Sequence, residues 1–214
     1  MLKVHGITFN PFQENTYLLY DSVSKDCFII DPGCLGSSEQ QRLVRIIEEL
    51  ELKPVRLLNT HCHLDHVFGN AFVAEQYGLE LGIHELELPL LEDYPGRARS
   101  YGIPGVEDSP APSYYLYPDQ PLGLGGHTVE LLFCPGHSPG HLCLYDREGG
   151  QIIGGDVLFA GSIGRTDLLG GDMATLLGSI HSQLLPLPDA TIVYPGHGPS
   201  TTIGEERNSN PFLQ

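Results

Sequence analysis

The sequence of 214 residues has little positive charge. It contains 11 lysines and arginines against 27 aspartates and glutamates, which gives a formal net charge of −16. A chain of this sign repels nucleic-acid phosphates and anionic membrane surfaces, so we expect neither as a partner. Two bound divalent ions would add four positive charges beside any acidic ligands. The distribution of acidic residues does not define an oligomeric state.

The sequence also lacks long apolar runs and paired cysteines. No run approaches the length of a membrane span, and Met1–His5 leads directly into an expected strand without a signal peptide. The cysteine count is odd, and no two cysteines form a CxxC pair, a pattern typical of reduced thiols. We therefore expect a cytoplasmic protein. The five cysteines are Cys27, Cys34, Cys62, Cys134 and Cys143.

Hydrophobic residues make up 41% of the chain, which is enough to bury a substantial core. We expect a single domain over residues 1–214, with a proline- and tyrosine-rich insertion at about 85–118. A long connection of this kind is usually functional or mobile. The insertion is interpreted either as a lid over a site or as a linker packed on the surface, and the sequence leaves both open.

Apolar periodicity predicts an α+β protein. The expected strands cover residues 2–9, 15–20, 27–30, 55–59, 80–83, 127–133, 141–145, 151–153 and 190–194. The expected helices cover residues 38–50, 65–77 and 173–184. Both halves repeat an order of strands, a helix and a strand whose end carries polar residues. This order suggests two mostly antiparallel sheets packed face to face, with helices outside.

The segment Thr60–His66 has the densest group of potential metal ligands, namely His61, His63, Asp65 and His66. It lies between an expected strand and an expected helix, so several side chains can reach one point. The first two histidines can converge on one ion, whereas the adjacent aspartate and third histidine diverge and could serve a second. Imidazole with carboxylate suits zinc, iron or manganese rather than calcium.

Three single residues follow apolar strands elsewhere in the chain: His137, Asp156 and His197. Each stands beside glycine, which lets the backbone turn tightly and a metal approach closely. Any one of them alone is weak evidence. Three similar strand ends, all distant in sequence from the first cluster, together predict that the metal site draws on both halves.

Several other residues receive a plainer interpretation. Asp31 is either a turn residue or a side chain pointing into a site, and the sequence does not decide. His141 is interpreted as supporting a ligand or starting a strand. We expect His84 and His181 to be loop and surface residues, and Cys62 to point away from the histidines beside it.

The motifs THCHLDH, PGHSPGH, GGD and PGHG together resemble the metallo-β-lactamase superfamily over nearly the whole chain. The resemblance implies an αββα sandwich with a metal pair at one edge. It implies that His61, His63 and His137 hold the first metal. Asp65, His66 and His197 would hold the second. Asp156 would bridge both.

A bridging aspartate is similar to the glyoxalase II type. The run Ser162–Asp167, the pair Gly171-Asp172 and the ending Pro199–Leu213 also resemble short, single-domain bacterial glyoxalase II-like hydrolases. Alternatively, the run Ser162–Asp167 has only a structural role, as a turn held by an Arg165–Asp167 ion pair. Two-domain glyoxalase II enzymes carry a further helical domain that binds glutathione, and we expect no counterpart of that domain here.

The resemblance implies a metal-dependent hydrolase of a small-molecule thioester, of the hydroxyacylglutathione type. Two divalent ions, with zinc favoured over iron or manganese, would share and activate the attacking water. The expected catalytic residues are Asp65, which ligates and orients that water, and Asp156. One alternative is a persulfide dioxygenase with a single iron on His61, His137 and Asp156. Another is a metal-binding protein without catalysis.

Overall fold

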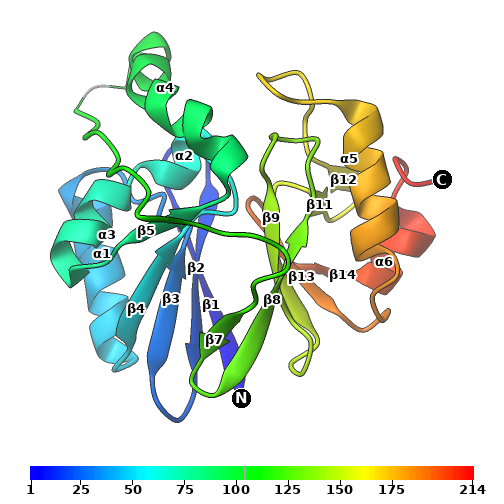
Figure 1. Ribbon diagram of the computed structural model, residues 1–214, viewed down its shortest axis with the longest axis horizontal. Helices are drawn as coiled ribbons and strands as arrows, with labels where there is room; N and C mark the ends of the chain where they lie inside the picture. Colours follow the sequence, from blue (N-terminus) through cyan, green and yellow to red (C-terminus); the bar gives the residue numbers. More distant parts are fainter. Residues whose placement is uncertain (104) are drawn as a thin grey trace. The chain divides into compact units, whose positions relative to one another are not determined.

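The computed structural model describes residues 1–103 and 105–214, so Pro104 of the expected insertion lies outside the described residues. The chain forms two units, and Figure 1 labels their elements. Unit 1 comprises residues 1–116 and 123–127, and unit 2 comprises residues 117–122 and 128–214. The expectation of one domain over 1–214 stays a prediction.

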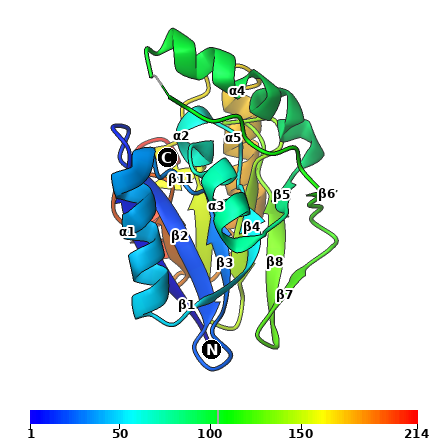
Figure 2. The ribbon, with the colours of Figure 1, turned by 90° about the vertical axis from the view of Figure 1, so that its left-hand side faces the viewer.

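Unit 1 contains a six-stranded sheet in the order β1-β2-β3-β4-β5-β6. Its strands are β1 Leu2–Phe9, β2 Glu14–Asp21, β3 Asp26–Ile30, β4 Lys53–Leu58, β5 Leu81–Ile83 and β6 Tyr114–Tyr115. Its helices are α1 Gly36–Glu49, α2 Leu64–Val67, α3 Asn70–Tyr77, the 3-10 turn η1 Glu85–Glu87 and α4 Leu88–Ser100. Figure 2 shows α1 and α3 lying over this sheet.

The first sheet is mixed, so the expectation of mostly antiparallel pairing is wrong for it. The pairs β1–β2 and β2–β3 are antiparallel, whereas β3–β4, β4–β5 and β5–β6 are parallel. The reason lies in the connections: α1 joins β3 to β4, and α2 with α3 joins β4 to β5. Helical crossovers of this kind bring consecutive strands back in the same direction.

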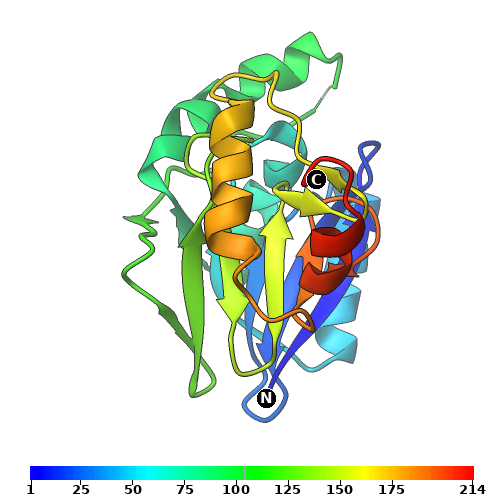
Figure 3. The same cartoon turned by 90° about the vertical axis from the view of Figure 1, so that its right-hand side faces the viewer.

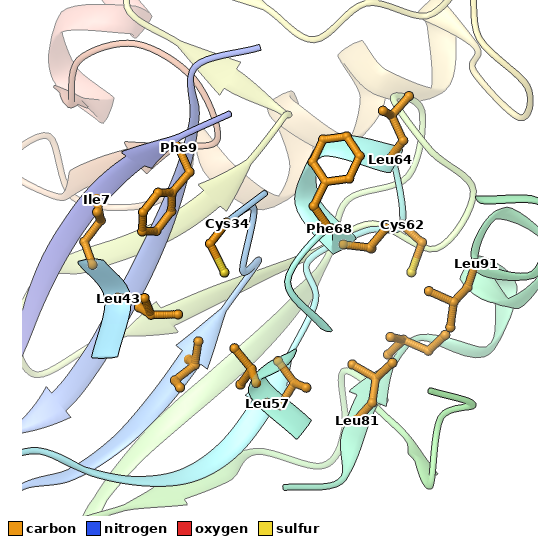
Figure 4. Close-up of a cluster of buried hydrophobic side chains, with 14 of the residues drawn as sticks. Ile7, Phe9, Cys34, Leu43, Leu57, Cys62, Leu64, Phe68, Leu81 and Leu91 are labelled. Carbon is orange, nitrogen blue, oxygen red and sulfur yellow. The ribbon is translucent and has the colours of Figure 1, made fainter. Parts of the chain in front are cut away.

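The core of unit 1 lies between this sheet and its helices. Leu43 and Ile47 are the buried residues of α1, and they join a cluster that includes Leu57 and Leu81. Figure 4 shows this cluster, with the Cys62 side chain in it on the side of Leu91. The segment that carries the densest potential ligands is therefore anchored in the hydrophobic core.

The predicted helix over 65–77 is interrupted. The structure ends α2 at Val67 and begins α3 at Asn70. Gly69 donates its N–H to the carbonyl of Pro32 at 2.7 Å, outside any helical pattern. A Cβ there would lie 2.5 Å from Cys34 Sγ, so only glycine fits. The chain therefore turns between the two helices and packs against the loop after β3.

The insertion at about 85–118 has more structure than the sequence predicted. It begins with η1 and α4, and it ends near β6. The proline in the first turn of α4 suits a helix start, but Pro95 lies inside the helix and locally disfavours it. Leu90, Leu91 and Tyr94 are buried in the unit 1 cluster, and this packing overrides the local preference.

Unit 2 contains most of a second six-stranded sheet, in the order β14-β13-β10-β9-β8-β7. Its elements are β7 Leu122–Leu124 and β8 His127–Phe133, which cross the boundary between the units, then β9 Leu142–Asp146, β10 Gln151–Gly155, β11 Leu158–Phe159, β12 Ser162–Ile163, α5 Met173–Ser179, the π-helical turn η2 Ile180–Leu184, β13 Ile192–Pro195, β14 Thr201–Thr202 and α6 Ile203–Ser209. Figure 3 shows α5 and α6 over the sheet. Among the described residues, no helix is long and apolar enough to cross a membrane.

Candidate functional site

The four potential ligands of unit 1 lie where the sequence predicted, on a strand-to-helix turn. β4 ends at Leu58 and α2 begins at Leu64, so two histidines precede the helix while Asp65 and His66 fall in its first turn. All four side chains are buried. The ring centroids of His61 and His63 are 4.8 Å apart with perpendicular planes, and those of His61 and His66 are 4.1 Å apart. The turn therefore concentrates imidazoles in a water-poor environment.

Asp31 holds this turn from the end of β3. Its carboxylate accepts hydrogen bonds from the N–H of Thr60 at 2.7 Å and from the Thr60 hydroxyl at 2.6 Å. Its Oδ2 also lies 3.1 Å from Nδ1 of His66. The backbone of Asp31 has φ of 50°, so it is a turn residue as well. Both interpretations that the sequence left open are therefore correct.

Asp31 also belongs to a group whose ligand atoms, with those of His61 and His66, lie within 4.8 Å of one another. Because its two oxygens already accept from Thr60, we interpret it as a partner of the ligands rather than a ligand. A carboxylate on one imidazole nitrogen orients the ring so that the other nitrogen can face a metal. The Thr60 hydroxyl, 3.0 Å from Nδ1 of His61, has the same position relative to that ring.

Glu14 is a residue of this region that the sequence analysis missed. It is fully buried on β2, its Oε2 accepts from the Thr16 hydroxyl at 3.0 Å, and its Oε1 lies 3.9 Å from Nδ1 of His66. Burial raises the pKa of the Glu14 carboxyl well above its ordinary value, and the charges of Asp31 and Asp65 raise it further. Glu14 is the first residue of β2 and is followed by Asn15 and Thr16, so no local pattern marks it as functional.

The Cys62 thiol faces away from the histidines, as expected. Cys62 is fully buried in the hydrophobic cluster with Leu64 and Leu91 (Figure 4). Burial first, and the negative charge of Glu87 second, raise the pKa of its thiol well above the ordinary value. A neutral thiol is a poor ligand, so this cysteine acts as a core residue of the turn.

In unit 2, the three predicted residues converge on one carboxylate oxygen. Asp156 follows β10 directly and His197 follows β13. The two strands are parallel neighbours, so their ends lie at the same edge of the sheet. Oδ2 of Asp156 lies 3.5 Å from Nε2 of His137 and 3.6 Å from Nε2 of His197. One carboxylate therefore stands between two imidazoles.

Backbone atoms orient these side chains. Nδ1 of His137 lies 2.8 Å from the carbonyl oxygen of Arg165, and its Nε2 is the nitrogen that faces Asp156. Nε2 of His141 accepts the N–H of Asp156 at 3.0 Å, so His141 supports a predicted ligand, as expected. A Cβ on Gly164 would lie 2.0 Å from the Asp156 carbonyl oxygen, so the loop after β12 packs directly on that residue.

The remaining predictions concern residues outside these clusters. His84 is the cap of η1, where its Nδ1 accepts the N–H of Leu86, and burial lowers its pKa. His181 is exposed on η2. Arg165 and Asp167 form the predicted ion pair, with nitrogen–oxygen distances of 2.7 and 2.8 Å. The Arg165 guanidinium lowers the pKa of Asp167 to about 2.

Each unit therefore brings together its own part of the predicted set. Unit 1 holds His61, His63, Asp65 and His66, and unit 2 holds His137, Asp156 and His197. Imidazole nitrogen and carboxylate oxygen are the ligand types of zinc, iron and manganese sites. Outer partners fix three of the imidazoles at Nδ1, which is a common arrangement around metal ligands. The donor sets of both units suit divalent metal ions.

Comparison with known proteins also indicates a metal-binding protein. A family model described as the metallo-beta-lactamase superfamily matches residues 9–197. Over 213 residues the chain is 41% identical to "Hydroxyacylglutathione hydrolase GloC" of Haemophilus influenzae, covering 99% of this chain and 98% of that protein. It is 39% identical over 214 residues to "Probable metallo-hydrolase YqgX" of Bacillus subtilis, with coverage of 99% and 98%.

Two solved structures match almost end to end. "BLEG-1 B3 metallo-beta-lactamase" is 38% identical with a TM-score of 0.90, covering 99% of this chain and all of that one. "TTHA1623 in a di-iron-bound form" is 40% identical with a TM-score of 0.87, covering 98% of this chain and all of that one. These likenesses confirm the fold that the motifs implied, including its α+β class.

Proposed function

Since the chain belongs to the metallo-β-lactamase superfamily, we propose that it is a binuclear hydrolase of thioesters of the hydroxyacylglutathione type. The family, the named relatives and the histidine–aspartate clusters indicate a metal-dependent hydrolase. Our proposal adds a binuclear mechanism, a set of metal ligands and a substrate class, and each has its own support.

The observation that carries the binuclear proposal is the position of Asp156. One of its carboxylate oxygens, Oδ2, lies within 3.6 Å of Nε2 of both His137 and His197, which follow different strands. Two neutral histidines need no shared carboxylate, whereas divalent ions held by those histidines would be stabilised by the negative charge of Asp156. The 40% identical TTHA1623 structure is of a di-iron-bound form, so a relative of this chain holds two metals.

The ligand assignment stays a proposal drawn from the resemblance. His61, His63 and His137 are proposed for the first metal. Asp65, His66 and His197 are proposed for the second, and Asp156 for both. The metals are divalent, with zinc favoured and with iron or manganese open, because the ligand types accept all three. We further propose a small-molecule thioester as the partner.

When bound, divalent ions lower the pKa of water towards neutrality and polarise the acyl carbonyl. The side chains supply orientation. Asp65 would help to hold a metal and to orient the attacking water. Its backbone carbonyl accepts from Asn10 Nδ2 at 3.1 Å, which fixes its place at the start of α2. His141 fixes the backbone of Asp156, and Asp31 fixes the ring of His66.

The substrate class is supported by the 41% identity to a protein named as a hydroxyacylglutathione hydrolase. The 38% identity to the BLEG-1 B3 metallo-β-lactamase instead favours a β-lactam substrate. We favour the thioester because a bridging aspartate resembles the glyoxalase II type. The question is one of substrate, so it is decided by a substrate panel on metal-replete protein.

The panel compares S-lactoylglutathione, a chromogenic cephalosporin and glutathione persulfide, with oxygen uptake recorded for the last. We expect turnover of the thioester at least about 100-fold faster, in kcat/KM, than that of the cephalosporin. Faster cephalosporin turnover would contradict the thioester proposal but retain the hydrolase. Oxygen uptake with no hydrolysis would move the assignment to the single-iron dioxygenase, and inertness towards every substrate would favour a non-catalytic metal-binding protein.

A further inference from the structure

The start of the insertion belongs to the same unit as the ligand turn and contacts it. In Figures 1 and 2, α4 lies at the end of unit 1 beside α2. Its buried face, which includes Leu91, Tyr94 and Ala98, joins the cluster that also holds Cys62. Such packing differs from that of a loop that lies loosely on a surface.

Two charged side chains of the segment hold the backbone of Cys62. Glu87, at the end of η1, is fully buried, and its Oε2 accepts the N–H of Cys62 at 2.7 Å. Arg97, on α4, donates from Nη2 to the carbonyl oxygen of Cys62 at 3.2 Å. The N–H belongs to the peptide between His61 and Cys62, and the carbonyl to the peptide between Cys62 and His63. Both peptides joining the two histidines are therefore held from the insertion.

The geometry of the two holding groups is itself fixed. Arg97 contacts the carbonyl of Leu90, about two helical turns away, and its Nε lies 3.7 Å from Asp93 Oδ2. The guanidinium is therefore oriented by its own helix before it reaches the turn. Glu87 ends a 3-10 turn whose first residue is capped by His84, which fixes its position on the chain. A buried carboxylate is costly unless donors compensate its charge, and the Cys62 N–H is one such donor to Glu87.

We propose that Glu87 and Arg97 are positioning residues, a brace that holds the ligand turn in its metal-binding conformation before any metal arrives. The proposal rests on the proposed metal-binding role of His61 and His63. It assigns η1 and α4 a different role from a lid, because a segment that holds the peptides between two ligands cannot lift away without releasing them. The imidazoles are kept 4.8 Å apart and perpendicular by this means.

The test measures zinc affinity of metal-free protein by competition with a chromogenic chelator. Glu87→Met keeps the size of the side chain and removes the acceptor, and Arg97→Met removes the donor. We expect each to weaken zinc binding by roughly 10- to 100-fold, the range found for outer partners of metal ligands. Glu87→Gln retains an oxygen acceptor and is expected to bind zinc within about threefold of wild type, a rescue that loss of packing would not give.

The matched controls are Glu85→Met and Arg99→Met, which remove the same charges from exposed positions on the same turn and helix. Both are expected to bind zinc as wild type does. A second measurement is hydrogen exchange in the metal-free protein: exchange of the Cys62 and His63 amides should accelerate in Glu87→Met while that of β4 does not change. If Glu87→Met fails to fold, Arg97→Met and Glu87→Gln decide.

Folded Glu87→Met and Arg97→Met proteins with wild-type zinc affinity would overturn the brace. A Glu87→Gln protein as weak as Glu87→Met would also overturn it, because the charge rather than the hydrogen bond would then be responsible. Failure of the brace can be distinguished from failure of the proposed function. Wild-type protein that binds zinc tightly but turns over no thioester rejects that substrate and leaves the brace standing.

Discussion

The two units support their predicted ligands in different ways. In unit 1, side chains hold the turn: Asp31 bonds Thr60 and His66, and Glu87 bonds the Cys62 amide. In unit 2, backbone atoms take a larger part: the Arg165 carbonyl contacts the His137 ring, and the one side-chain support described above, His141, accepts the backbone N–H of Asp156. Clustered ligands on one turn can share side-chain supports. Isolated ligands on separate strands depend on glycine and on close backbone packing.

Removing a side chain should therefore damage unit 1 most. In Asp31→Ala, both donors of Thr60 lose their acceptor and Nδ1 of His66 loses its partner. Alanine is also strained at φ of 50°, where aspartate and asparagine are tolerated. We expect a loss of about 3 kcal/mol or more in the free energy of unfolding, measured by urea denaturation of metal-free protein.

Asp31→Asn serves as the control for this change. Asparagine accepts the same φ and retains one oxygen acceptor for the Thr60 amide. It should recover roughly half of the lost free energy. Equal losses in the alanine and asparagine variants would show that the carboxylate charge, rather than turn geometry and hydrogen bonding, dominates at this position.

Adding a side chain should damage unit 2. Gly136 precedes His137 with φ of 125°, and a Cβ there would lie 2.2 Å from the backbone nitrogen of Leu176. Gly136→Ala should lower the free energy of unfolding by roughly 2–4 kcal/mol, from backbone strain and overpacking together. Gly178→Ala on α5 is the control, since a Cβ there meets nothing within 4 Å.

We expect Gly178→Ala to leave stability unchanged or to raise it by up to about 1 kcal/mol, because alanine is the better helix former. A Gly136→Ala protein as stable as wild type would show that α5 can move away at little cost. The contrast between backbone-held and side-chain-held ligands would then fail for this strand end.

The smallest effect concerns the exposed loop that carries Arg165. Its guanidinium, not its backbone, lowers the pKa of Asp167 to about 2. Arg165→Met should raise that pKa towards the ordinary 3.8, as followed by carbon NMR titration. Asp21 of unit 1, whose pKa is also about 2 because of the Ser24 backbone N–H, provides an internal reference that should not move.

The lowered pKa of Asp167 determines how its contribution to stability changes with pH. The folded state favours the charged form of Asp167, so its stabilisation is complete above pH 3.8 and disappears as pH falls towards 2. Arg165→Met should lose that stabilisation but keep the backbone carbonyl that contacts His137. Its metal affinity should therefore equal that of wild type, and a weakened affinity would contradict backbone support in unit 2.

The parts of the site that could be predicted were those written in short patterns. The run from His61 to His66 is dense, and His137, Asp156 and His197 each stand beside glycine at a strand end. The order of strands likewise indicated the α+β class. These features depend on local sequence, which the chain displays directly.

The missed parts depend on contacts between distant residues. Glu14 and Glu87 are carboxylates whose burial comes from tertiary packing, and no neighbouring residue marks either one. The helix α4 contains Pro95, so its local sequence argued against it until Leu90 and Tyr94 packed into the core. Parallel pairing in the first sheet was missed because strand direction follows from the crossover helices rather than from strand composition.

The most direct test of the central claim is metal content measured by mass spectrometry, together with thioester turnover, for wild type and Asp156→Asn. The exposed Asp119→Asn variant is the matched control. We expect about two metals per chain in wild type and the control. We expect fewer metals, and kcat/KM lower by roughly 100-fold or more, in Asp156→Asn. A metal-replete Asp156→Asn protein with wild-type turnover would contradict the bridging role and the binuclear mechanism built on it.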